Sequence, residues 1–180
     1  MTPAERERAT NYFAETRERL LRTMSGLSRA QFEYKPAADR WSAAECLEHI
    51  TMVEGFIFSN LEKTLQRAAD STRPAVSDDD IVRLVEDRST RVKGPERLMP
   101  AGRVPLDKLF SEFEAVRRRS AEFAANTTTE LRQHTWPHPI LGPCDCYQWL
   151  LLMAAHGERH RLQAEEVMAE PGFPRAAAAV

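Results

Sequence analysis

The stretch Met153-Ala154-Ala155-His156-Gly157-Glu158-Arg159-His160 lies inside a segment that predicts one long helix, opening at Asp145 and ending before Pro171. Two residues four apart on a helix are separated by about 40° around the axis and about 6 Å along it. The imidazoles of His156 and His160 therefore leave the same face of the helix. Whether this face is part of an ordinary core or of a metal site depends on whether another helix supplies a third ligand.

Three more segments have apolar residues repeating with the period of a helix. Several helix starts carry a capping box, in which a serine, threonine or aspartate is followed three residues later by glutamate or glutamine. The predicted helices cover residues 2–25, 42–69, 106–126 and 145–170. The predicted capping boxes are Thr2 with Glu5, Ser42 with Glu45, and Asp145 with Gln148.

The connections are rich in proline and glycine. Residues 31–40 predict an irregular link, and residues 70–105 predict a connection with one short helix, at 78–91. No segment predicts a strand, so the fold class is all-α: a four-helix bundle with a long crossover connection between helices two and three. We expect a single domain over residues 1–172 and a loose C-terminal tail over residues 173–180.

A second pair of histidines has the same spacing without the same geometry. His134 and His138 lie four apart in a predicted loop, where Pro137 and Pro139 prevent the helix that would align them. Either histidine could still approach a site from a loop, and His138 is the one retained as a candidate.

The composition is typical of a globular protein, with nearly equal numbers of acidic and basic residues. Of 180 residues, 42% are hydrophobic and 29% are charged, and the net charge is -2. This balance gives no electrostatic reason to expect nucleic acid or a membrane as a partner, and the run Arg117-Arg118-Arg119 is expected to be a solvated flank. No apolar run approaches the roughly 20 residues of a membrane span, and the charged N-terminus does not resemble a signal peptide. We expect a cytoplasmic protein whose three cysteines form no disulfide framework.

His49 is the candidate third member of the histidine cluster. It falls in the second turn of the predicted helix 42–69, at the edge of its apolar stripe. In a bundle it can meet His156 and His160, and three imidazoles from two helices form a metal site with positions open to water or substrate. Neutral imidazole suits zinc, nickel, iron and copper. The alternative is that each is an ordinary, partly buried and hydrogen-bonded histidine.

Two better-known metal sites do not fit. A zincin needs His-Glu-x-x-His, but Glu158 follows His156 by two residues and lies about 200° around the helix. A ferritin-like di-iron site needs Glu-x-x-His on each of two helices, and Cys46 stands three residues before His49.

The residues resemble a known family. Trp41-Ser42-Ala43-Ala44-Glu45-Cys46-Leu47-Glu48-His49-Ile50 is similar to the opening of helix two in the DinB/YfiT-like superfamily. His138-Pro139-Ile140-Leu141-Gly142 and His156-x-x-x-His160-x-x-Gln163 resemble that superfamily's last loop and last helix, and the match covers residues 3–170. The resemblance implies a four-helix bundle, a homodimer, and a divalent metal ion, zinc or nickel, held by His49, His156 and His160.

The resemblance also implies a reaction class. Some relatives are metal-dependent transferases that use a low-molecular-weight thiol such as bacillithiol or mycothiol. We therefore expect a transferase in which a metal-bound thiolate attacks an electrophilic small molecule. A metal-dependent hydrolase with a metal-bound water is the closest alternative, and a non-catalytic metal-binding stress-response protein is the third. The sequence assigns no catalytic residue beyond the metal ligands.

Overall fold

Four long helices form a bundle, which confirms the predicted all-α fold class. The computed structural model describes residues 1–70, 72–92 and 94–175. The long helices are α1 (Pro3–Met24), α3 (Ala43–Leu65), α5 (Leu109–Asn126) and α6 (Cys146–Met168). The shorter elements are the helices α2 (Arg29–Phe32) and α4 (Asp78–Glu86), the 3-10 turns η1 (Glu96–Leu98), η2 (Leu106–Lys108) and η3 (Leu131–Gln133), and the strands β1 (Thr135–His138) and β2 (Gly142–Asp145).

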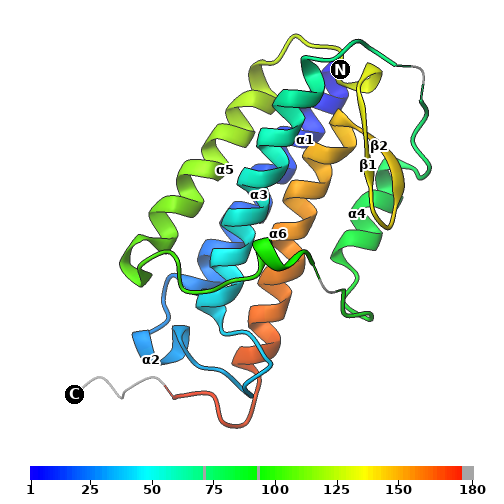
Figure 1. Cartoon of the computed structure of the whole chain (residues 1–180). Coiled ribbons are helices and arrows are strands. Elements are labelled where there is room, and N and C mark those ends of the chain that lie inside the picture. The colour runs from blue at the N-terminus through cyan, green and yellow to red at the C-terminus, as the bar shows by residue number, and fades with distance from the viewer. Residues whose placement is uncertain (71, 93, 176–180) are drawn as a thin grey trace.

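The order of the helices around the bundle explains the long connection. Each of α3 and α1 packs against both α5 and α6. In Figure 1, α1 and α6 run in one direction and α3 and α5 in the other. Because α3 and α5 are parallel neighbours, the chain between them must return along the bundle. Residues 66–108 make this return, and on the way α4 packs against α6.

Complete capping boxes mark three of the helix starts in the described part of the chain. At α1, α2 and α3 a side-chain oxygen accepts from the backbone N–H three residues on, and the third residue's side chain accepts from the backbone of the cap. The capping boxes of α1 and α3 are the predicted ones. The box of α2 was not predicted, and this short helix overlaps the first two residues of the link 31–40, which was expected to be irregular. The pairs are Thr2 with Glu5, Ser28 with Gln31, and Ser42 with Glu45.

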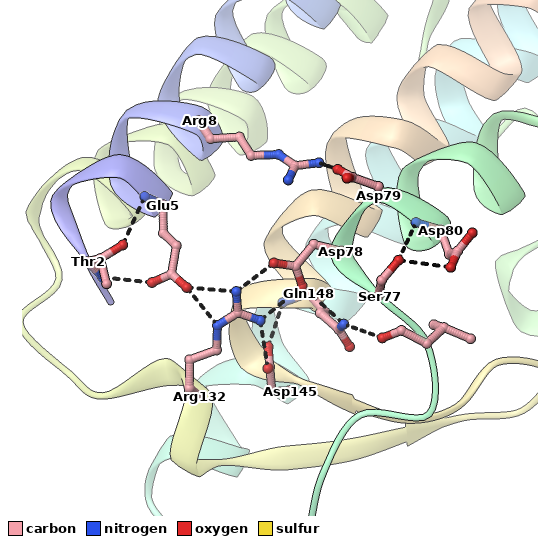
Figure 2. A network of polar contacts seen from close by, with 11 residues as sticks. Thr2, Glu5, Arg8, Ser77, Asp78, Asp79, Asp80, Arg132, Asp145 and Gln148 are labelled. Atoms are coloured by element: carbon pink, nitrogen blue, oxygen red, sulfur yellow. Dashed lines mark hydrogen bonds and ion pairs between the residues drawn. The ribbon is translucent and has the colours of Figure 1, made fainter.

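α6 begins at a polar network that also holds the first turns of α1 and α4 (Figure 2). Asp145 caps α6 by accepting from the Gln148 backbone N–H at 2.8 Å. The Gln148 side chain donates to Asp78 instead of returning to the cap, so the second half of the predicted capping box is wrong. Arg132 lies between Glu5, Asp78 and Asp145 and donates to all three carboxylates.

A β-hairpin replaces part of the predicted loop before α6. β1 and β2 pair antiparallel, from Thr135 opposite Asp145 to His138 opposite Gly142. Gly142 has a φ of 74°, which favours glycine at this position. The expectation of no strand is therefore wrong here; four-residue strands containing proline are too short to show an alternating pattern. The expectation that no helix aligns His134 with His138 is confirmed.

The core has two apolar clusters separated by a polar layer. One cluster includes Phe13 and Leu150, and the other includes Leu20 and Ala164. Between them Arg117 of α5 forms an ion pair with Glu54 of α3, at 2.8 Å. The expectation that Arg117 belongs to a solvated flank is wrong, since its side chain is fully buried. It occupies the inward position four residues after Phe113, which the run of three arginines conceals.

The last described residues lie beside α2. The Phe173 ring packs edge-on against Tyr34, and the Pro174 carbonyl accepts from the Gln31 side chain. Residues 176–180 of the predicted loose tail are outside the described residues. Among the described helices, none combines the length and the apolar character that crossing a bilayer requires.

Candidate metal centre

The structure brings together the three histidines singled out in the sequence. His49 comes from the second turn of α3, and His156 and His160 come from successive turns of α6. One ring nitrogen of each lies within 4.8 Å of the others. The ring centroids are 4.5 Å apart for His156 and His160, 4.6 Å for His49 and His160, and 5.0 Å for His49 and His156. The three rings therefore form one compact cluster.

Hydrogen bonds fix the tautomers of two of these rings. Nδ1 of His49 lies 2.7 Å from the Leu98 carbonyl oxygen, and Nδ1 of His160 lies 2.9 Å from Oε1 of Gln163. Both partners are acceptors, so each Nδ1 donates its hydrogen and each Nε2 keeps a free lone pair. In metal-binding histidines, the ring nitrogen that does not bind the metal usually donates its hydrogen to such an oxygen, which fixes the tautomer and the orientation of the ring.

Burial keeps the cluster in the form that binds metal ions. His49 and His160 are buried and His156 is half-buried. Burial lowers the pKa of His49, which the Leu98 hydrogen bond only partly opposes. Burial, together with the neighbouring histidines, holds the pKa values of His156 and His160 well below the usual value. All three imidazoles are therefore neutral at pH 7, as metal coordination requires.

The dimensions suit a divalent ion. Zinc–nitrogen bonds of about 2.1 Å place two ligand nitrogens about 3.4 Å apart in a tetrahedral site, so small ring rotations would bring this cluster to bonding distance. Within residues 1–70, 72–92 and 94–175, the cluster of possible metal ligands consists of these three histidines and includes no carboxylate or thiol. A three-ligand set leaves positions for water or substrate, as catalytic sites do.

Trp41 covers one side of the cluster. Its ring stacks on His160, with centroids 5.5 Å apart and planes at 27°, and lies 4.7 Å from the ring of His49. Beyond His160, Arg88 donates to Oε1 of Gln163 at 3.2 Å and is itself held by Glu166. The support of His160 therefore extends from α6 to the segment that follows α4.

A buried carboxylate holds the loop that supports His49. Glu48, which is 2% exposed, accepts from the backbone N–H groups of Ala101, Gly102 and Arg103. The same loop supplies the Leu98 carbonyl. Sequence reasoning missed Glu48 and Leu98, because their partners lie about fifty residues away along the chain. The hydrogen bond from His160 to Gln163 does have a signal in the sequence, because residues three apart on a helix lie on the same face.

Other candidate residues lie elsewhere. Glu158 pairs with Arg161 at 2.9 Å and with Arg19 of α1, so it faces away from the cluster. Cys46 is buried and takes no part in the cluster. His134 is outside the cluster, whereas His138 lines a cavity beside it.

Two cavities lie beside the cluster, each lined by a different histidine. One of about 290 Å³ is lined by His160 and Trp41 among others. A second of about 150 Å³ is lined by His156 and His138. The Nδ1 atom of His138 accepts the backbone N–H groups of Ile140 and Leu141, at 3.2 and 3.1 Å. Its ring hydrogen must therefore be on Nε2, which makes His138 a hydrogen-bond donor.

Known proteins resemble this chain in sequence and in fold. The uncharacterized protein YuaE of Bacillus subtilis (strain 168) is 24% identical over 156 residues, which are 86% of this chain and 94% of YuaE. The solved structure of YfiT from Bacillus subtilis, described as a probable metal-dependent hydrolase with an unusual four-helix bundle topology, matches with a TM-score of 0.65. The match covers 97% of this chain and 91% of the YfiT chain at 11% identity, so it shows the shared fold. The model of the DinB superfamily matches residues 12–164, most of the chain, and this protein therefore belongs to the DinB superfamily.

Proposed function

We propose that this protein is a divalent-metal-dependent enzyme in which His49, His156 and His160 hold the ion. The observation that carries the proposal is the convergence of three neutral imidazoles beside two cavities. When bound, a zinc or nickel ion would supply Lewis-acid activation of a nucleophile at neutral pH. The Leu98 carbonyl and Gln163 would hold two of the rings in the tautomer that presents Nε2.

We further propose that the reaction is hydrolysis of a small molecule. The fold that this chain shares with YfiT, described as a probable metal-dependent hydrolase, supports this choice. Transfer of a low-molecular-weight thiol, which the family resemblance implies, is the second candidate. A non-catalytic metal-binding protein is disfavoured by the two cavities that reach the histidines, because structural metal sites are closed by a fourth protein ligand. We also propose that the protein is a homodimer, which light scattering would test, and that it is cytoplasmic, which cell fractionation would test.

His138 has a separate role in this proposal. Its Nε2–H would donate a hydrogen bond to the substrate oxygen on which negative charge develops. Loss of one such donor typically slows an enzyme about 100-fold. We therefore expect His138→Ala to lower kcat by about that factor while the metal content stays unchanged. An equal loss of metal and activity would contradict this role, and His134→Ala is the matched control.

The first test is metal content. Wild-type protein purified and dialysed against zinc or nickel is expected to retain one ion per chain by elemental analysis. His49→Ala is expected to lose it, and His134→Ala, outside the cluster, to keep it. A wild-type protein that retains no ion under either condition overturns the proposal.

The second test separates the two reactions. Metal-loaded protein is supplied with an activated ester without thiol, and with 1-chloro-2,4-dinitrobenzene in the presence of a small thiol. Hydrolysis that needs metal and no thiol, and that disappears in His160→Ala, supports the hydrolase. Conjugation that requires the thiol, with no ester hydrolysis, would replace it by the transferase.

A further inference from the structure

The two cavities beside the histidines differ in chemistry. We call the larger the arginine cavity, because Arg40, Arg88, Arg91 and Arg159 line it together with His160. We call the smaller the apolar cavity, because its walls include Leu84, Val92, Ile140, Leu141 and Leu152 together with His156. Val92 and Arg159 line both. The two cavities therefore adjoin one another at these two residues, and each is lined by one member of the histidine cluster.

Positive charge in the arginine cavity is only partly neutralised. Arg88 is paired with Glu166 at 2.7 Å, and Arg40 with Glu170 at 3.4 Å. Arg159 donates instead to backbone carbonyls in the last turn of α4 and just after it, including that of Thr90 at 2.7 Å.

Two of the lining arginines lack an acidic partner. Within the part of the chain that the structure describes, neither Arg91 nor Arg159 forms an ion pair. Arg88 and Arg159 line the same cavity, where their like charges repel one another. Asp39 is the one acidic residue in the lining. An anion placed in this cavity would gain charge-assisted hydrogen bonds and relieve that repulsion.

Exposed apolar residues surround the apolar cavity. Among the described residues, the large hydrophobic side chains that are exposed are Leu84 at 36%, Val92 at 56% and Ile140 at 64%. All three line this one cavity, although they come from α4, the segment after it and the β1–β2 turn. Apolar walls around a small cavity with a few polar groups are typical of a site for an apolar ligand group.

We propose that the histidine site acts on an amphiphilic anion. The carboxylate or phosphate of this substrate lies in the arginine cavity, its alkyl or aryl group lies in the apolar cavity, and the reacting bond lies at the histidines between them. Arg91 and Ile140 are the specificity-determining residues, one for each end. This inference rests on the proposed function, since it names the substrate class of the same site.

Octanoate is the probe, because it carries both an acid and an alkyl chain. Binding to the zinc-loaded 180-residue chain is measured by calorimetry. Acetate, which carries the acid alone, and 1-octanol, which carries the alkyl chain without the acid, are measured beside it. We expect octanoate to bind at least tenfold more tightly than either. Octyl phosphate, measured in the same way, distinguishes a preference for phosphate from one for carboxylate.

Two surface variants separate the contributions of the arginine cavity and the apolar cavity to octanoate binding. Arg91→Gln is expected to weaken octanoate binding about fivefold to tenfold and to leave 1-octanol unchanged. Ile140→Ser is expected to weaken both by a similar factor. Both residues are exposed, so neither substitution threatens folding. Arg22→Gln, at an exposed arginine paired with Glu18 outside both cavities, is the matched control and should change nothing.

The outcomes separate this inference from the proposed function. Metal content is measured for every protein, and a wild type that retains neither zinc nor nickel overturns the proposed function whatever binds to it. Zinc-loaded protein whose octanoate affinity is unchanged in both Arg91→Gln and Ile140→Ser overturns the amphiphilic substrate alone. The amphiphilic substrate is also overturned if Ile140→Ser alters only the oligomeric state, because the apolar walls would then belong to a contact between copies of the chain.

Discussion

Gly157 leaves room for the Arg117 side chain of α5 at the turn of α6 that carries His156 and Glu158. It lies between His156, in the metal cluster, and Glu158, which faces α1. A Cβ atom at this position would be 2.8 Å from Nη2 of Arg117 and 3.8 Å from Cγ2 of Ile50. Arg117 cannot easily move aside, because it is buried and bonded to Glu54 and Thr16. A residue without a side chain is therefore needed beside the histidine.

Gly157→Ala is expected to destabilise the protein. Alanine in a helix interior is normally about 1 kcal/mol better than glycine, but here the clash with Arg117 should outweigh that gain and leave a net loss of about 2 kcal/mol. Urea unfolding measures the change. The matched control is Gly55→Ala in α3, where no atom lies within 4 Å of the added Cβ and stability should rise by up to about 1 kcal/mol. Equal gains at both positions would contradict this account.

Gln163 is expected to tune metal affinity through His160. Its Oε1 atom accepts from Nδ1 of His160 and from Arg88. Gln163→Leu removes this acceptor, and loss of such a support typically lowers metal affinity tenfold to 100-fold. Competition with a coloured zinc chelator gives the affinity. Gln163→Glu keeps an acceptor and should retain most of the affinity; the prediction fails if the two variants lose affinity equally.

At the scale of elements, the loop from Pro95 to Arg103 is held against α3 by two adjacent residues. Glu48 accepts three backbone N–H groups of the loop, at 2.6 to 3.1 Å, and His49 donates to its Leu98 carbonyl. One carboxylate therefore satisfies a run of loop donors that secondary structure leaves unpaired.

Glu48→Ala is expected to loosen the whole loop. The amides of Ala101, Gly102 and Arg103 should exchange hydrogen at least tenfold faster, because their shared acceptor is gone. Metal affinity should also fall several-fold, since the Leu98 carbonyl would no longer be held at His49. Hydrogen exchange read by mass spectrometry tests this. Glu62→Ala, at an exposed position later in α3, is the control. Unchanged exchange at the three amides would show that other contacts hold the loop.

Elements with local signals could be predicted, and those that depend on distant partners could not. The boxes at Ser42 and at Thr2 fix helix starts through contacts three residues apart, so the sequence contains both partners side by side. The pairing of His156 with His160 follows equally from helix geometry. The hairpin, the loop bound by Glu48 and the buried position of Arg117 all depend on tertiary contacts, and their residue patterns resemble those of exposed loops and flanks.

At the scale of the whole molecule, α6 joins two polar centres. Its middle carries the histidines, and its N-terminus lies at the Arg132 network (Figure 2). Arg132 binds carboxylates from α1, from α4 and from the cap of α6, and its guanidinium lies 4.2 Å from the centre of the Tyr147 ring. The network therefore joins the bundle to the segment that covers its flank.

The pKa values in this network set how its contribution depends on pH. Burial opposes ionisation of Glu5 and Asp78, but their hydrogen bonds, including those from Arg132, outweigh it and hold both pKa values below the ordinary 4.5 and 3.8. These two carboxylates stabilise the fold above their unfolded pKa values, and the contribution is lost as the pH falls through the folded ones. Burial raises the pKa of Asp145 despite Arg132, so its protonation in acid partly offsets that loss.

Arg132→Met should therefore destabilise the protein in a pH-dependent way. At pH 7 the variant leaves three carboxylates without their cation, and we expect a loss of about 2 kcal/mol, less than for a fully buried pair because Arg132 is partly exposed. At pH 3, which lies below the ordinary pKa values of Glu5 and Asp78, part of their contribution is already lost in the wild type, so the difference should shrink to about 1 kcal/mol. Urea unfolding at the two pH values measures it. Arg22→Gln, which breaks an exposed pair with Glu18, should cost under about 0.5 kcal/mol at either pH. A loss that is the same at pH 3 and pH 7 would mean that Arg132 acts through its packing on Tyr147 and not through its charge.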